Sequence, residues 1–160
     1  WQQAELSRKQ RNNLDACIGV FSRTLLDLLE RQVLQAGTDV DRNSATEMHQ
    51  LRIECKKLRY AAEFFMSITP GLDTFIGHMR GLQEILGIMN DVAVMQHLLD
   101  TLLQGQEDTE VIRYAGALMG WRTRQYFDLL DDFDARWMEF IHAKHPWWHK
   151  HPQPDKISCD

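Results

Sequence analysis

The sequence has few of the residues that interrupt helices or cross-link a chain: four prolines, nine glycines and three cysteines among 160 residues. Scarce proline and glycine favour long helices over many short strands. The cysteine number is odd and no two are spaced as CxxC, which argues against a disulfide framework or a cysteine-ligated zinc site. This usage favours free thiols in a reducing cytoplasm. Apolar runs are only a few residues long, so no membrane-spanning helix is predicted.

Common signatures of catalysis are also missing. The sequence contains no P-loop, no glycine-rich phosphate cradle, no HExxH and no GxSxG. Its first residues, WQQAELSRKQRNN, lack the hydrophobic centre of a secretion signal. We therefore expect a cytoplasmic protein that is not an enzyme, with no catalytic residues, no cofactor and no bound metal.

Apolar residues recur at helical spacing along most of the chain. Their pattern predicts helices over about residues 3–35, 45–67, 72–87, 90–103 and 109–143. The second begins with the capping box SATE, from Ser44 to Glu47. Gly87 interrupts the pattern, and Asn90 with Asp91 offers a new helix start. The prediction is an all-α antiparallel bundle of about five helices, up-and-down with short loops, in one domain of residues 1–145 followed by a tail of residues 146–160.

The stretch HQLRIECKKLRYAAEFF, residues 49–65, concentrates positive charge in a chain of net charge -5. Between positions 49 and 60 there are four cations against one acid, a local charge of +3 (Arg52, Lys56, Lys57 and Arg59 against Glu54). At about 100° per residue, one arc of roughly 80° carries His49, Arg52, Lys56, Arg59 and Glu63. Tyr60 flanks this arc and Lys57 lies further round. The helix is predicted to have one apolar and one cationic face.

Two interpretations of the cationic face stay open on these residues. It is either solvated or paired with the acidic segment 126–139, or it binds a polyanion. Cations on successive turns lie about 5 to 6 Å apart and repel one another unless a counter-charge runs beside them. A linear polyanion supplies that charge repeatedly, and arginine holds two oxygens of one phosphate.

Two blocks of this sequence resemble the CHAD family, the conserved-histidine α-helical domains. The first block is the stretch 49–65, in which the matching residues are His49, Arg52, Lys56, Lys57, Arg59, Tyr60 and Glu63. The second is LQEILGIMNDVAV, residues 82–94, with Gln83, Gly87, Asn90 and Asp91 matching and Arg80 just before it. GWRTR (120–124) and RWMEF (136–140) are similar to the closing helix.

The resemblance implies an all-helical, non-catalytic module that binds inorganic polyphosphate, in the cytoplasm or at polyphosphate granules. The residues expected to contact polyphosphate are His49, Arg52, Lys56, Lys57, Arg59, Tyr60 and Arg80. Gln83 and Asp91 are candidates for orienting the basic side chains. The family domain carries two helical repeats, and these blocks resemble the second. A missing N-terminal repeat or a second copy of the chain is therefore an expected partner.

Other functions are also compatible with these residues. A helical scaffold whose basic face docks an acidic protein is the main alternative, and a histidine-based phosphorelay or metal-binding module is another. Nucleic acid is disfavoured because the net charge is negative and no aromatic array interleaves the cations. Arg122 and Arg124 are expected to be solvated. The histidines at 142, 145, 149 and 151 favour a solvated tail over a metal site, and the sequence leaves open whether Trp147 and Trp148 pack on the bundle or face a partner.

Overall fold

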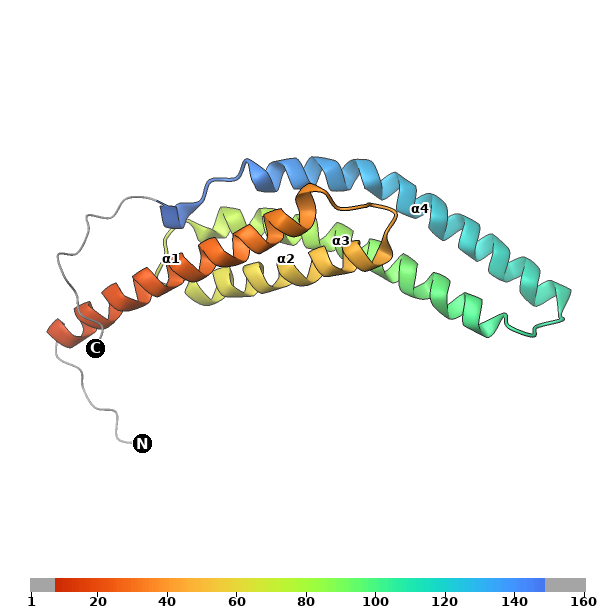
Figure 1. Ribbon diagram of the computed structural model, residues 1–160, viewed down its shortest axis with the longest axis horizontal. Coiled ribbons are helices and arrows are strands. Elements are labelled where there is room, and N and C mark those ends of the chain that lie inside the picture. Colours follow the sequence, from red (N-terminus) through yellow and green to blue (C-terminus); the bar gives the residue numbers. More distant parts are fainter. Residues whose placement is uncertain (1–7, 149–160) are drawn as a thin grey trace, which may run out of the picture.

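The computed structural model describes residues 8–148, which form four α-helices and one short 3-10 helix and contain no strand. These elements are α1 (Arg8–Thr38), α2 (Ala45–Phe65), α3 (Leu72–Leu102), α4 (Thr109–Ile141) and the 3-10 helix η1 (Pro146–Trp148). Helix α2 packs against α1 and α3, and α3 packs against α4 (Figure 1). The all-α prediction is confirmed. None of the described helices is both long and apolar enough to cross a membrane.

The two helices predicted over residues 72–87 and 90–103 are one continuous helix, α3, so the expected count of about five is wrong. Gly87 costs about 1 kcal/mol inside a helix. Its neighbours Leu86 and Met89 are buried on the core-facing side of α3, and their packing favours continuing the helix. Asn90 does not cap a new helix, because its side chain is hydrogen-bonded to α2 instead.

The predicted start of α2 is confirmed, although only half of the capping box forms. Ser44 is extended at the N-cap, and its hydroxyl oxygen accepts the backbone N–H of Glu47 at 3.3 Å. The Glu47 carboxylate accepts the backbone N–H of Asp41 at 2.9 Å rather than that of Ser44. The loop before α2 is therefore tied to its first turn. This fixes where along α2 the basic residues begin.

The predicted apolar face of α2 forms the centre of the core. Its buried side chains are Met48, Leu51, Cys55, Leu58, Ala62 and Phe65. They pack against buried residues of α1 and α3, which leaves the cationic side of α2 outside the core. Cys55 is a free thiol, and burial raises its pKa, so it is a poor nucleophile. Cys17 is disulfide-bonded, so the expectation of free thiols is wrong for that residue.

The segment after α4 packs back onto the bundle. Trp147 is buried, with its ring centroid 4.8 Å from that of Phe75 on α3. The indole N–H groups of Trp147 and Trp148 both donate to Asp27 of α1, at 2.8 and 2.6 Å. Trp147 therefore packs into the bundle, whereas Trp148 is hydrogen-bonded to α1 and stays 60% exposed. They tie the end of the described chain to α1.

Two of the four histidines near the end of the sequence make contacts within the bundle. His145 Nδ1 lies 3.0 Å from a carboxylate oxygen of Glu30, which is buried on α1. The ring of His142 contacts the carbonyl of Met138 at 2.8 Å. His149 and His151 lie outside the described residues. Within residues 8–148, no group of three or more potential metal-ligating side chains comes together.

Candidate functional site

The cationic side of α2 lies along α3 and forms a polar seam with it. Among the described residues, three contacts between side chains cross this seam: His49 with Asn90, Arg59 with Gln83, and Glu63 with Arg80, at 2.7, 2.7 and 2.9 Å. From one contact to the next, the residue numbers increase along α2 and decrease along α3, as expected for antiparallel helices. We call this surface the α2–α3 seam, comprising His49, Arg52, Lys56, Arg59 and Glu63 of α2 with Arg80, Gln83 and Asn90 of α3.

One carboxylate serves two arginines in the seam. Glu63 Oε1 accepts from an Arg59 terminal nitrogen and from an Arg80 terminal nitrogen, both at 2.9 Å. The hydrogen bond from Arg80, aided by the positive charges of Arg59 and Arg80, holds the pKa of Glu63 below its usual value. Glu63 is therefore ionised at neutral pH, and one negative charge faces two positive ones.

Gln83 fixes the position of Arg59. Its side-chain N–H donates to the backbone carbonyl of Cys55 at 2.7 Å, and its carbonyl accepts Arg59 Nε at 2.7 Å. The Arg59 guanidinium also lies over the ring of Tyr60, with 4.5 Å to the ring centroid. These contacts confirm the expectation that Gln83 orients a basic side chain. Asp91, the second candidate for such a role, is exposed.

Arg52 and Lys56 lie between the His49 and Arg59 contacts along α2, and both are half-buried. Arg52 Nε is buried with no hydrogen-bond partner among the described residues. Lys56 takes part in no ion pair in the described part of the chain. These two cations therefore lack the carboxylate that Arg59 and Arg80 share.

Lys57 is placed apart from the seam. Its ammonium group donates to both carboxylate oxygens of the buried Glu54, at 2.9 and 3.0 Å, and Gln50 donates to the same carboxylate at 2.6 Å. This pairing offsets the charge of Lys57. Of the seven residues expected to contact polyphosphate, the structure thus brings His49, Arg52, Lys56, Arg59 and Arg80 to one surface, with Tyr60 beside Arg59.

The acidic segment of α4 finds partners other than α2. Asp134 pairs with Arg42, Asp128 pairs with Arg124 at 2.8 Å, and Glu139 pairs with Arg136 at 2.8 Å. No ion pair within the described residues joins this segment to the basic side of α2. In the described part of the chain, α4 therefore does not neutralise the cationic face of α2.

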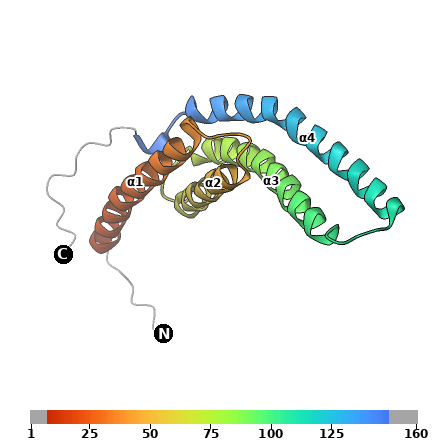
Figure 2. The same cartoon turned by 45° about the vertical axis from the view of Figure 1, so that its right-hand side comes forward.

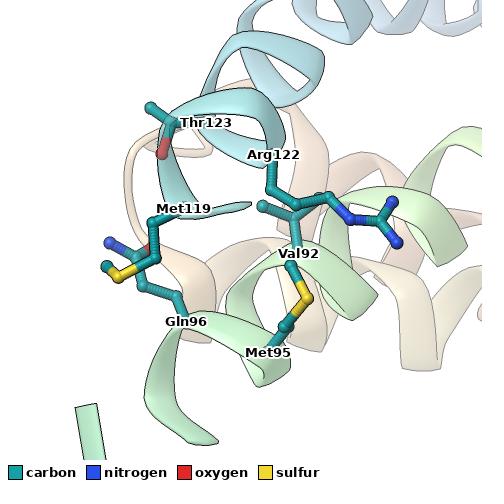
Figure 3. Close-up of a pocket in the computed structure, with 6 residues that line it drawn as sticks. All are labelled: Val92, Met95, Gln96, Met119, Arg122 and Thr123. Atoms are coloured by element: carbon teal, nitrogen blue, oxygen red, sulfur yellow. The ribbon is translucent and has the colours of Figure 1, made fainter. Parts of the chain in front are cut away.

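Arg122 differs from the expectation of a solvated side chain. It is half-buried on α4 at a small pocket lined by Val92 and Met95 of α3 and Met119 of α4 (Figure 3). One terminal nitrogen donates to Gln125 at 2.7 Å, while Nε is buried without a partner among the described residues. Arg124 is exposed, as expected, and pairs with Asp128. The position of Arg122 in the sequence gave no sign of its burial, because that burial depends on the packing of α4 on α3.

Residues 2–100 match the CHAD domain family, which is more than half of the chain. The matched range includes the whole of α2 and nearly all of α3, and so both sides of the α2–α3 seam. The chain therefore belongs to the CHAD domain family, in agreement with the two sequence blocks. No curated protein and no solved structure matches it.

Proposed function

We propose that this protein binds inorganic polyphosphate along the α2–α3 seam. The observation that carries the proposal is the charge imbalance of this surface. Arg59 and Arg80 share the single carboxylate of Glu63, while Arg52 and Lys56 have no acidic partner in the described part of the chain. Membership of the CHAD family, which is associated with polyphosphate binding, supports the same ligand.

The chemistry of the seam suits a flexible anion with many charges. Cations on successive turns are separated by about 5 to 6 Å, so phosphate groups of one chain can approach several of them together. Arg52, Arg59 and Arg80 offer planar guanidinium donors, and Lys56 offers a mobile point charge. His49 adds a ring at the far end of the seam, beside Asn90. We assign these five side chains as contacts, and Tyr60 as a support for Arg59.

Lys57 has a smaller role in this proposal. Because Glu54 neutralises its ammonium group, Lys57 adds little net charge to the surface. Neutralising Lys57 is expected to weaken polyphosphate binding less than neutralising Lys56, its neighbour in the chain. The proposed role is binding, with no group-transfer step assigned to His49.

The test is a calorimetric titration of the 160-residue chain with long-chain polyphosphate at low salt. An Arg52→Gln/Lys56→Gln variant removes two seam cations, and an Arg31→Gln/Arg113→Gln variant removes two exposed cations from other helices. Both variants have the same net charge. Binding that weakens about ten-fold or more in the first variant and stays near wild type in the second supports the seam. Equal losses in both variants would show that only the net charge matters.

The same titration separates this function from docking of an acidic protein. A surface built for one protein partner has no reason to bind a phosphate polymer more tightly as the polymer lengthens. Orthophosphate, short polyphosphate and long polyphosphate are therefore compared. Absence of binding by any of them at low salt would contradict the proposal.

A further inference from the structure

The far ends of α3 and α4 form a hairpin that extends beyond α2 (Figures 1 and 2). Large apolar side chains are exposed on this hairpin, with between 38% and 66% of each accessible. They are Val94, Leu98 and Leu102 of α3, and Val111, Tyr114, Leu118 and Trp121 of α4. Exposed apolar side chains that gather on one surface mark interaction sites in soluble proteins.

Helical spacing places these side chains on one flank of the hairpin. The opposite flank carries a shallow pocket lined by Ala93 of α3 and by Thr123 and Phe127 of α4. Leu98 is five residues after Ala93 and Leu118 is five before Thr123, so each lies about 140° round its helix from the pocket. We call the exposed flank, with the seven side chains named above, the hairpin face.

On α4, the spacing of the apolar residues of the hairpin face is symmetric about its midpoint. Val111, Tyr114, Leu118 and Trp121 are spaced by three, four and three residues. This spacing reads the same in both directions from its midpoint near residue 116. When two copies of α4 run antiparallel, Val111 of one is therefore opposite Trp121 of the other, and Tyr114 is opposite Leu118. The spacing is that of the core positions of a coiled coil.

The charges that flank this pattern are also complementary in the antiparallel arrangement. Glu110 precedes the apolar stripe and Arg124 follows it, fourteen residues apart and hence at equivalent positions of two heptads. Each is paired within its own chain, Glu110 with Arg113 at 3.0 Å and Arg124 with Asp128 at 2.8 Å. Both side chains nevertheless stay exposed, with 65% and 78% accessible, so each can also reach a second copy. Reversing one copy brings Glu110 of each chain beside Arg124 of the other. In a parallel arrangement these equivalent positions lie on opposite sides of the interface, so this pairing is absent.

We propose that the hairpin face binds a second copy of this chain, with the two α4 helices antiparallel about a two-fold axis near residue 116. Each α3 stripe of Val94, Leu98 and Leu102 then covers the side of the same interface. A two-fold interface uses the same patch twice, as the symmetric spacing of α4 requires. Aromatic side chains are enriched in such interfaces, and this face contributes Tyr114 and Trp121.

The first test is sedimentation velocity of the 160-residue chain across a range of concentrations, without polyphosphate. Leaving polyphosphate out keeps this result separate from the function proposed for the seam. A concentration-dependent dimer is expected. A Tyr114→Ser/Leu118→Ser variant should dimerise about ten-fold or more weakly, because it removes apolar contacts at the centre of the interface. A chain that stays monomeric at every concentration overturns the proposal.

The matched control is an Ile112→Ser/Phe127→Ser variant, which removes two apolar side chains from other faces of α4. Both residues are exposed, so the fold is expected to tolerate the change. The control should dimerise like the wild type, and circular dichroism should show the same helix content in both variants. Equal losses of dimer in the two variants would overturn the assignment of the hairpin face.

The arrangement itself is tested by reversing charges. Glu110→Lys alone places two lysine–arginine pairs in the dimer, and Arg124→Glu alone places two acidic pairs in it, so each variant should dimerise more weakly. Mixing the two variants restores one native pair and one reversed pair. The mixture should therefore form a heterodimer more tightly than either variant forms its homodimer. If the mixed variants form a dimer no more tightly than each variant does alone, the antiparallel pairing is wrong.

Discussion

Gln83 of α3 accepts the Nε–H of Arg59 of α2 at 2.7 Å, and this hydrogen bond crosses the centre of the seam. The other end of the Gln83 side chain donates to the carbonyl of Cys55 in the middle of α2. One uncharged residue thereby sets both the packing of α2 on α3 and the direction of a guanidinium. The energetics of the seam can be probed at this residue without altering the net charge.

Gln83→Ala is expected to lower the free energy of unfolding by about 1–2 kcal/mol, since two hydrogen bonds are lost and one involves a charged group. Polyphosphate binding should also weaken, because Arg59 loses the partner that orients it. Urea unfolding and calorimetry measure the two effects. Binding of unchanged affinity in a folded Gln83→Ala protein would show that the orientation of Arg59 does not matter.

Glu63→Gln should strengthen polyphosphate binding, because it removes the carboxylate that Arg59 and Arg80 share. Its affinity should also depend more steeply on salt than that of the wild type. Glu107→Gln, which neutralises an exposed acid in the loop before α4, controls for the change in net charge. Similar affinity gains in both variants would mean that Glu63 has no local effect.

The lowered pKa of Glu63 also predicts that the free energy of unfolding depends on pH in the acid range. Its pKa is lowered in the folded protein, so the folded state binds a proton there less readily than the unfolded state. The stabilisation is complete above the ordinary pKa of 4.5 and is lost as the pH falls through the lowered pKa. In urea unfolding, the free energy of unfolding should fall less between pH 6 and pH 3 for Glu63→Gln than for wild type. Parallel curves would contradict this linkage.

Glu30 should give a pH dependence of the opposite sign. Burial, with the nearby charge of Asp27, raises its pKa from 4.5 to about 7. Between these values the folded state binds more protons than the unfolded state, so Glu30 lowers the free energy of unfolding as the pH rises. Burial lowers the pKa of His145, which contributes the reverse trend below its ordinary value of 6.5.

Glu30→Gln should therefore remove a loss of stability that the wild type shows between pH 5 and pH 8. Thermal unfolding at both pH values measures the difference. Glu107→Gln, which alters an exposed carboxylate, should retain the wild-type difference. If Glu30→Gln loses as much stability as the wild type over this range, the buried carboxyl is not its source.

Trp147 and Trp148 offer a matched pair of substitutions, because both donate an indole N–H to Asp27. Trp147 is 3% exposed and Trp148 is 60% exposed. Trp147→Ala should cost about 3 kcal/mol of unfolding free energy through the cavity it leaves, and Trp148→Ala about 1 kcal/mol or less. Urea unfolding measures both. Equal costs would show that the hydrogen bonds, rather than burial, hold this segment.

The fold was predictable as far as local signals determine it. Helical periodicity identified the all-α class, and the SATE box located the start of α2. The separation of α3 into two helices was wrong because Gly87 and Asn90 act through tertiary contacts: packing carries the helix past Gly87, and His49 binds Asn90. Local helix-start signals cannot report such partners. The burial of Trp147 likewise depends on Phe75 and Asp27, which lie far from it in the sequence.

The candidate site was predictable in composition and less so in arrangement. The spacing of His49, Arg52, Lys56 and Arg59 indicated one cationic side of a helix. It did not reveal that Glu63 serves two arginines or that Glu54 offsets Lys57. Those relations depend on side-chain direction and on the register of α2 against α3. The exposed apolar face of the hairpin also became apparent only once the ends of α3 and α4 were seen to extend beyond α2.

The most direct test of the polyphosphate proposal is the affinity of the wild-type chain as a function of polyphosphate length and salt concentration. Binding should tighten as the polymer lengthens to span the seam. The logarithm of the affinity should fall with the logarithm of salt with a slope of about -2 to -4, for roughly three to five phosphate charges neutralised. Affinity that is independent of both polymer length and salt would contradict the account.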